Sequence, residues 1–318
     1  MNFKLIAFCC MLYTICYFLY AADISAPKME ILDTPEGRVT SFPQGIIITD
    51  KDATITGKNA LFYERDNRAK IFDSLLITTP QFRITADTAF YQFDEKKTTL
   101  RGHVKVESET LLINTPVLIF EQGRNLVTAH DNVNLKEKQQ NLTIISRFGQ
   151  YNFTDAIGVA DSSPTLYIER SETTTVNSNK MILDNRNALF TAIDSVSVIT
   201  AKSTLKCDTL IFFIKEDSGL AFGHPKVFDS KNQINGNTIK FFFAHADTQE
   251  NIHDKTSLRK VKVLQAGNAT YVTDDGGILE VFGDFFSINY KDGDVDYITV
   301  SSDTLKNVTG KFTPKKEL

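Results

Sequence analysis

Apolar and polar residues alternate along most of the chain, in short runs separated by turn-forming residues. In residues 82–91 the alternation changes phase at Asp87-Thr88, and it continues in 100–106 after the polar turn Phe93–Lys97. Alternation with period two predicts strands that have one buried and one solvated face. Helical spacing is not sustained outside the first 22 residues, so we expect a nearly all-β chain with a bulge or bend at 87–88.

The same pattern recurs in degenerate form along the chain. An apolar anchor closes the first strand of each unit, and the anchors follow one another at 29, 29, 31, 32, 29 and 29 residues. The anchors are Phe62, Tyr91, Phe120, Tyr151, Leu183, Phe212 and Phe241. A fixed period of this length is typical of a repeat array rather than of a single globular core.

A second landmark follows each anchor after eleven residues and is small or turn-forming. It is Asp73, Gly102, Asp131, Ser162, Asp194 or Gly223. Two residues later Leu75, Val104, Val133, Pro164, Val196 or Pro225 begins another strand segment. Each unit therefore has a strand-turn-strand pattern with a bend.

Stacked units of this kind fit three architectures. Polar turns beside both strands favour an elongated pair of antiparallel sheets that fold against each other, built from repeats of about 29 residues. A parallel β-helix is the alternative. Propeller blades are disfavoured, because a blade needs about four strands in roughly 40–50 residues.

The pattern also divides the chain into segments. We expect a secretory leader or N-terminal anchor at 1–22, an N-terminal segment at 23–45, β repeats at 46–243, a polar insertion at 244–260, a C-terminal β repeat at 261–300 and a charged tail at 301–318. The repeat crosses both halves of the chain without a Gly/Ser-rich or Pro-rich linker, so we expect one elongated body.

Residues 1–22 have the features of an export signal. Lys4 precedes an apolar run that ends in Ala21-Ala22. The residue three positions before either cleavage point, Leu19 or Tyr20, is large, so an uncleaved anchor in the inner membrane is the alternative. Three of the four cysteines lie in this segment and leave Cys207 alone, which excludes an intramolecular disulfide in the exported chain. Cys207 occupies the unit position of Ala86, where a small buried hydrophobe is expected.

Charge and motifs argue against several functions. Without the leader, 34 basic residues stand against 39 acidic ones, which disfavours nucleic acid as a partner. None of the five histidines has metal-type spacing, and Asp87 and Asp208 recur at one unit position, as turn residues do. We expect no catalytic residues, no metal site and no cofactor.

Two sequence motifs resemble a known family. The form Ile-x-Ala-Asp-x-Ala-x-Tyr at 84–91, followed by x-Gly-x-Val-x-Val at 101–106, and residues 263–271 are similar to the OstA-like modules of periplasmic lipopolysaccharide-transport proteins. That family includes the soluble bridge LptA, the membrane-anchored LptC and the periplasmic domain of LptD. The resemblance covers roughly residues 45–300.

The resemblance implies an elongated antiparallel β-jellyroll, shaped like a folded sheet, whose apolar groove shields the acyl chains of lipopolysaccharide or a related lipid in the periplasm. It also implies docking of other OstA-like proteins, or of further copies of the chain, on terminal strands. Alternating faces supply such a groove independently of the resemblance. Its candidate residues are Phe62, Leu75, Tyr91, Val104, Phe120, Val133, Leu183, Val196, Phe212 and Phe241.

Other interpretations stay open at this point. The same side chains would fill the closed core of a secreted structural or adhesive β-solenoid. Four Asn-x-Ser/Thr sequons, at Asn141, Asn152, Asn268 and Asn307, and the terminal Lys-Lys-Glu-Leu would also suit a luminal protein of a eukaryote.

Overall fold

The computed structural model describes residues 23–35, 37–50, 53–80, 82–109, 111–138, 141–169, 173–229, 231–243, 258–273, 275–291, 294–303 and 307–314. The predicted leader and most of the predicted insertion, residues 244–257, lie outside these ranges. The described residues form two compact units. The N-terminal unit runs to Pro164 and includes Asp184–Arg186, and the C-terminal unit comprises Thr165–Leu183 and Asn187–Leu318.

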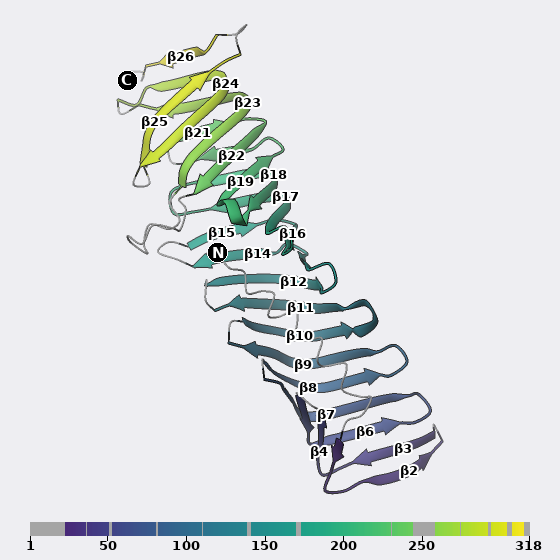
Figure 1. Cartoon of the computed structure of the whole chain (residues 1–318). Coiled ribbons are helices and arrows are strands. Elements are labelled where there is room, and N and C mark those ends of the chain that lie inside the picture. Colours follow the sequence, from purple (N-terminus) through teal and green to yellow (C-terminus); the bar gives the residue numbers. More distant parts are fainter. Residues whose placement is uncertain are drawn as a thin grey trace. The chain divides into compact units, whose positions relative to one another are not determined.

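The N-terminal unit is a folded sheet, whose strands follow one another from purple to teal in Figure 1. They are β1 (Asp23–Ser25), β2 (Glu30–Thr34), β3 (Gly37–Phe42), β4 (Ile46–Asp50), β5 (Ala53–Gly57), β6 (Asn59–Tyr63), β7 (Arg68–Thr78), β8 (Phe82–Gln92), β9 (Lys97–Ser108), β10 (Leu111–Glu121), β11 (Leu126–Glu137), β12 (Leu142–Asn152) and β13 (Ile157–Asp161). The short 3₁₀ helix η2 (Gln122–Arg124) joins β10 to β11.

The C-terminal unit repeats this construction. Its strands are β14 (Thr165–Glu169), β15 (Thr173–Asn177), β16 (Lys180–Asp184), β17 (Leu189–Ile199), β18 (Thr204–Phe213), β19 (Ser218–Phe222), β20 (Lys226–Phe228), β21 (Asn232–Asn235), β22 (Thr238–Phe243), β23 (Leu258–Val272), β24 (Ile278–Lys291), β25 (Asp294–Ser301) and β26 (Thr309–Thr313). The 3₁₀ helix η3 (Ile214–Glu216) joins β18 to β19.

Strand pairing confirms the predicted fold class. From β7 to β12 each strand pairs antiparallel with the next along the chain, and β17, β18, β23 and β24 continue this in the C-terminal unit. Among the described residues the chain contains no α-helix. The protein is therefore an all-β antiparallel jellyroll of strand-turn-strand repeats. Antiparallel pairing also excludes the parallel β-helix for these strands.

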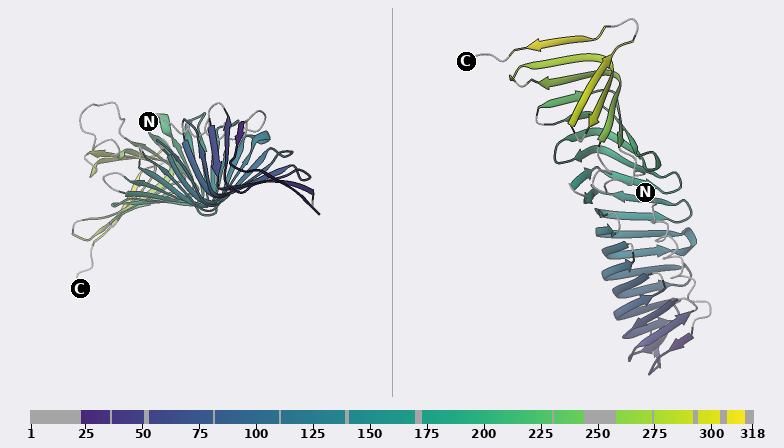
Figure 2. Two further views of the ribbon diagram at one scale, coloured as in Figure 1. Left: turned by 90° about the horizontal axis from the view of Figure 1, so that it is seen from below. Right: turned by 60° about the vertical axis from the view of Figure 1, so that its left-hand side comes forward.

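Each long strand bends once and belongs to two arms of the folded sheet. Between β7 and β8 the register shifts from Phe72 to Leu75, and between β8 and β9 it shifts from Thr85 to Thr88. The predicted break at Asp87-Thr88 is thus confirmed as this bend. We call this bend the corner. The half of the folded sheet that holds the anchors is the first arm, and the half on the other side of the corner is the second arm. In Figure 2 (left) the strands of the N-terminal unit spread from this corner.

Two consecutive left-handed residues turn the chain at each corner. The pairs are Asp73-Ser74, Gly102-His103, Asp131-Asn132, Ser162-Ser163, Asp194-Ser195 and Gly223-His224, with φ between 44° and 75°. Their first members are the small or turn-forming landmark of the sequence. Left-handed backbone is strained for most side chains and favours Gly, Asn and Asp. This conformational requirement explains why the landmark recurs.

A second series of left-handed residues ends the hairpins at the free margin of the first arm. It consists of Asn67, Lys96, Asn125, Ala156, Ala188 and Asp217. Five of their carbonyl groups, all except that of Lys96, accept backbone hydrogen bonds from the end of the next hairpin, as in Phe93 N to Asn67 O at 3.1 Å and Phe153 N to Asn125 O at 2.9 Å. Since these residues have the same spacing as the anchors, the sequence period is the period of this hairpin stack.

Small residues face inward where the partner strand crosses the corner. They are Gly57, Ala86, Thr115, Ser146, Ser178, Cys207 and Gly236, again in the anchor spacing. Gly57 has no room for a side chain, because a Cβ atom there would lie 2.3 Å from Cγ2 of Ile71. In Thr115 the hydroxyl group donates to the carbonyl oxygen of His130 at 2.8 Å, so a polar side chain is satisfied there. Cys207 lies at the position of Ala86, as predicted.

Candidate apolar groove

The inner faces of the two arms carry most of the predicted groove residues, at two depths. The first row lies just beyond the corner on the second arm. Leu75, Val104 and Val196 are 1% exposed, and Val133 is 6% exposed. In the N-terminal unit Leu75 and Val104 belong to one packed cluster that joins both arms. This row fills the corner with protein atoms.

The second row is formed by the anchors on the first arm. Phe120 and Phe241 are buried, at 1% and 9% exposure. Phe62, Tyr91, Leu183 and Phe212 are only half-buried. These four side chains lie on the first arm near its hairpins, away from the corner. The second row thus contains the predicted groove residues that the protein covers least.

Three aromatic triads surround anchors of the second row. In the first, Phe93 packs edge-on against Phe62 and Tyr91, with ring centroids 5.6 and 4.6 Å apart. Phe153 does the same with Phe120 and Tyr151, at 6.1 and 5.2 Å. In the C-terminal unit Phe243 packs on Phe212 and Phe241 at 5.9 and 5.6 Å. Edge-to-face packing of this kind is favourable beyond the area that it buries.

The third ring of each triad was not among the sequence-predicted residues. The predicted turn that begins at Phe93 is confirmed, but the ring of Phe93 packs against two anchors, so the turn is not polar at this residue. A signal was present, because Phe93, Phe153 and Phe243 each follow an anchor by two residues. It recurs in only some units and is therefore easily missed.

Two tyrosines bring hydroxyl groups into the interior of the C-terminal unit. Tyr271 lies on β23 two residues after the fully buried Ala269, and its hydroxyl is buried without a hydrogen-bond partner among the described residues. Burial raises the pKa of Tyr271 to about 12, with smaller contributions from repulsion by Tyr290 once it is ionised at high pH and by the Asp229 carboxylate. Burial likewise raises the pKa of Tyr290. The interior is therefore apolar enough to disfavour phenolate.

Removal of the Tyr271 hydroxyl should change how stability depends on pH. Below pH 10 the phenol is neutral in both states; as the pH rises towards 12 the unfolded chain loses this proton first, so the folded state is destabilised. We expect the urea midpoint of the wild type to fall more between pH 9.5 and 11.5 than that of Tyr271→Phe. At pH 8 the variant should be at least as stable, because an unsatisfied buried group is removed. Equal pH profiles would contradict this assignment.

Cys207 is buried, as the sequence predicts for this position, and its chemistry follows from that. Burial, and then the charge of Asp208, raise the pKa of the Cys207 thiol to about 12. Because the thiolate is the reactive form, the thiol should be inert at ordinary pH. Iodoacetamide at pH 8 should therefore leave Cys207 unmodified in the native protein and modify it in urea, as measured by peptide mass spectrometry. Rapid modification of the native protein would show that this corner opens.

The outer face holds the acids and histidines of the corner. His103 Nδ1 lies 2.9 Å from Asp87 Oδ2, but both side chains are well exposed. Asp87 and Asp208 occupy equivalent corner positions, each against the glycine of the facing corner pair. Within the described ranges no cluster of His, Cys, Asp and Glu could hold a metal ion. In the same ranges no helix has the length and apolar character needed to cross a membrane.

Strands with one unpaired edge and exposed apolar side chains occur together near the first and the last described strands. Among the described strands, β1 pairs with β4, β2 with β3, and both β25 and β26 with β24 alone. The exposed large hydrophobic residues near these strands are Ile24, Met29, Ile31, Leu32 and Ile47 at one end, and Val272, Ile278, Phe282, Phe285, Tyr297, Val308 and Phe312 at the other. Such strand edges can pair with another chain.

These features define an all-β repeat protein with an apolar interior. No protein-family model matches the chain, and no curated protein matches it. Among solved structures it is similar to LptH, the LptA-homologous periplasmic component of the lipopolysaccharide transport device from Pseudomonas aeruginosa. That match has 14% identity and a TM-score of 0.20, and it covers 42% of this chain and 76% of the other. A likeness this weak gives no basis for inferring function.

Proposed function

We propose that the protein is a non-enzymatic envelope lipid-transport protein that shields acyl chains of lipopolysaccharide, or of a related lipid, inside the folded sheet. The observation that carries this proposal is the second row, because half-buried apolar side chains occupy the same position in four units, at Phe62, Tyr91, Leu183 and Phe212. Each methylene group kept from water is worth about 0.8 kcal/mol, so a lipid with several chains needs such a cover. The resemblance of the 84–91 and 101–106 motifs to OstA-like modules supports the same function.

The two depths of the interior suggest where an acyl chain lies. The corner row is already packed in the N-terminal unit, where Leu75 and Val104 belong to the buried cluster. The half-buried Phe62, Tyr91 and Phe212 have exposed ring surface that an acyl chain would cover. In this proposal the chain lies along the aromatic triads of the first arm. It is shielded passively, and the energy for transport comes from other proteins.

The terminal strands suggest how the lipid is passed on. An exposed edge accepts a strand from another protein by β-augmentation, and the apolar residues beside it would be buried in that contact. We propose that β1 and β2 at one end, and β25 and β26 at the other, bind OstA-like partners or further copies of this chain. This role requires export to the periplasm, either as a cleaved chain or as one retained at the inner membrane by residues 1–22.

Lipid carried through purification tests the proposal. The protein is purified from its native host without detergent, and bound lipid is extracted and identified by mass spectrometry. The wild type should carry acyl lipid, and the double variant Tyr91→Asp/Phe212→Asp should lose most of it. A matched control is Lys105→Asp, since Lys105 lies on the outer face and pairs with Glu107 at 2.7 Å.

A structural or adhesive role is the second candidate, and the packed corner favours it. In this reading the inner side chains only complete a closed core, as in any two-layer β protein. Folded wild type that carries no lipid, with edges that bind no envelope protein, would support this reading and contradict lipid transport.

A further inference from the structure

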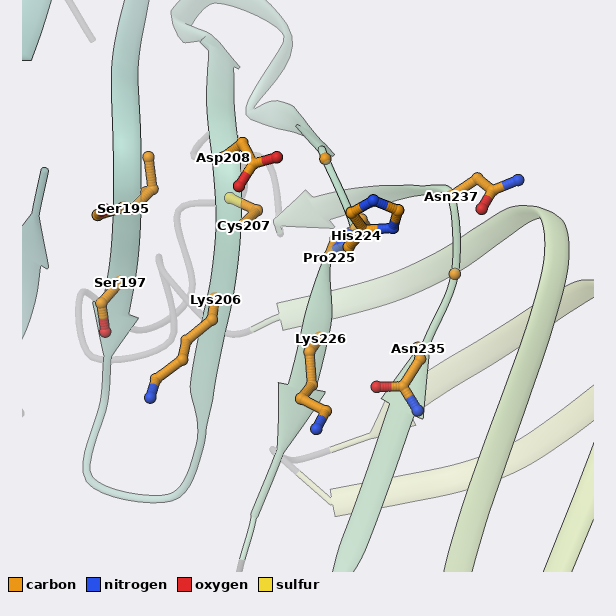
Figure 3. Close-up of a pocket in the computed structure, with 13 residues that line it drawn as sticks. Ser195, Ser197, Lys206, Cys207, Asp208, His224, Pro225, Lys226, Asn235 and Asn237 are labelled. Atoms are coloured by element: carbon orange, nitrogen blue, oxygen red, sulfur yellow. The ribbon is translucent and has the colours of Figure 1, made fainter.

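A groove with polar and apolar lining lies at the corner of the C-terminal unit, where the inward-facing Val196 and Cys207 form part of its wall. It has a volume of about 870 Å³ and crosses the corner at β17, β18 and the link between β19 and β20. Figure 3 shows Ser197, Lys206, Lys226 and Asn235 projecting from neighbouring strands into view. Nothing in the lipid proposal uses these residues.

Strand register brings the polar side chains into one row. Ser197 is opposite Lys206, Lys206 is opposite Lys226, and Lys226 is opposite Asn235. The row continues to Asn268, whose Oδ1 accepts a hydrogen bond from Asn235 Nδ2 at 3.0 Å. At about 4.8 Å between strands the five residues span roughly 19 Å. The row thus offers a hydroxyl, two ammonium groups and two amides along a line.

The two lysines carry a charge that the protein does not neutralise. Like charges directly opposite in a sheet are destabilising. Neither ammonium group forms an ion pair with a carboxylate of the described residues. Lys206 Nζ lies over the Phe228 ring at 5.7 Å, whereas Lys226 has no such contact with a ring of the described residues. Asp208 is the one acid lining the groove, so the groove is net positive in a chain of formal net charge −4.

A second corner groove shows that this charge is not dictated by the fold. In the N-terminal unit the outer face of the corner has a smaller groove, of about 480 Å³, lined by Lys58, Asp73, Ser74 and Asp87. Two acids and one lysine make that groove net negative. The corner geometry supplies the hollow in both units, and the side chains decide which ligand charge it can accept.

We infer that the groove of the C-terminal unit binds a saccharide that carries an anionic group, a phosphate or a carboxylate. Lys206 and Lys226 hold the anion between them, through charge-assisted hydrogen bonds. Ser197 and Asn235, which line the groove, exchange hydrogen bonds with the sugar hydroxyl groups, since amides and hydroxyls both donate and accept. The anion removes the repulsion between the two lysines.

Three small ligands test recognition of the anion and recognition of the sugar separately. Binding of glucose 6-phosphate, glucose and inorganic phosphate is measured by NMR titration of the folded protein. We expect glucose 6-phosphate to bind at least tenfold more tightly than either other probe. Lys226→Ala should weaken that binding about tenfold, and Asn235→Ala should weaken it less while leaving phosphate binding unchanged. The matched control Lys105→Ala, an outer-face lysine that is already paired, should have no effect.

The source of the saccharide is tested with two further ligands. Intact lipopolysaccharide presents the anionic sugar as a lipid headgroup, and its alkali-deacylated form presents it as a free saccharide. If both ligands bind more weakly to Lys206→Ala/Lys226→Ala than to the wild type, the groove binds the saccharide whether or not it is attached to lipid. If only intact lipopolysaccharide binds more weakly, the groove binds the saccharide as a lipid headgroup. Tyr91→Asp should leave the deacylated form bound, so failure of the acyl-chain proposal would not affect this result. Equal binding of phosphate and glucose 6-phosphate, or no effect of the lysine variants, would overturn the inference.

Discussion

Phe120→Ala is expected to lower the free energy of unfolding of the N-terminal unit by about 3–5 kcal/mol, the usual range for removing a buried aromatic ring. Phe120 is 1% exposed and packs against Phe153 with ring centroids 6.1 Å apart. It also belongs to the cluster that joins both arms, so the cavity would lie inside the core. Urea unfolding followed by circular dichroism measures the loss.

Phe62→Ala is the matched control for this prediction. Phe62 occupies the same position of another unit but is half-buried, so less transfer free energy is lost and the remaining space stays open to solvent. We expect a clearly smaller destabilisation than for Phe120→Ala. Equal losses for the two variants would mean that Phe62 is packed as tightly as Phe120, and would remove the distinction between buried and half-buried anchors on which the acyl-chain site depends.

The second large effect is expected at the corner glycine Gly102. Its φ of +75° costs a side chain about 1–2 kcal/mol, and a Cβ atom there would lie 2.1 Å from Oδ2 of Asp87. Gly102→Ala should therefore destabilise by more than the backbone strain alone. Adding Asp87→Gly should recover only the part due to the collision. Urea midpoints of the single and double variants measure both parts.

Gly123→Ala is the matched control for Gly102→Ala. Gly123 lies in η2, and a Cβ atom there would have no neighbour within 4 Å. This variant should be nearly neutral or slightly stabilising, because alanine restricts the unfolded chain. If both variants destabilise alike, the corner conformation is not what constrains the landmark.

The sequence was sufficient to predict the fold because the backbone repeats its unusual conformations at fixed places. Asp73, Gly102 and Asp131 are recognisable as turn formers, and in the structure each begins a left-handed pair. The phase change at Asp87-Thr88 likewise corresponds to a register shift. At these positions the conformational preference of the residue agrees with the burial pattern of its neighbours. The corners can therefore be predicted from the sequence without knowledge of tertiary contacts.

Features that depend on packing and register could not be predicted in this way. The ring of Phe93 packs on anchors of two different units, although its neighbours Asp94 and Glu95 make the segment look like a polar turn. The opposition of Lys206 and Lys226 depends on the pairing of β18 with β20, which the interruption at Gly223-His224-Pro225 creates. The difference between packed and half-buried groove residues also arises only from how the two arms meet.

Site-specific photocrosslinking in cells of the native host tests the central claim most directly. A photoreactive residue is placed in turn at Tyr91 and Phe212, which are half-buried, at the buried Phe120, and at the outward-facing Lys105. Acyl-chain shielding predicts lipopolysaccharide adducts at Tyr91 and Phe212, few at Phe120 and none at Lys105. A folded protein that gives no lipid adduct at Tyr91 or Phe212 would contradict the account and favour a closed structural core.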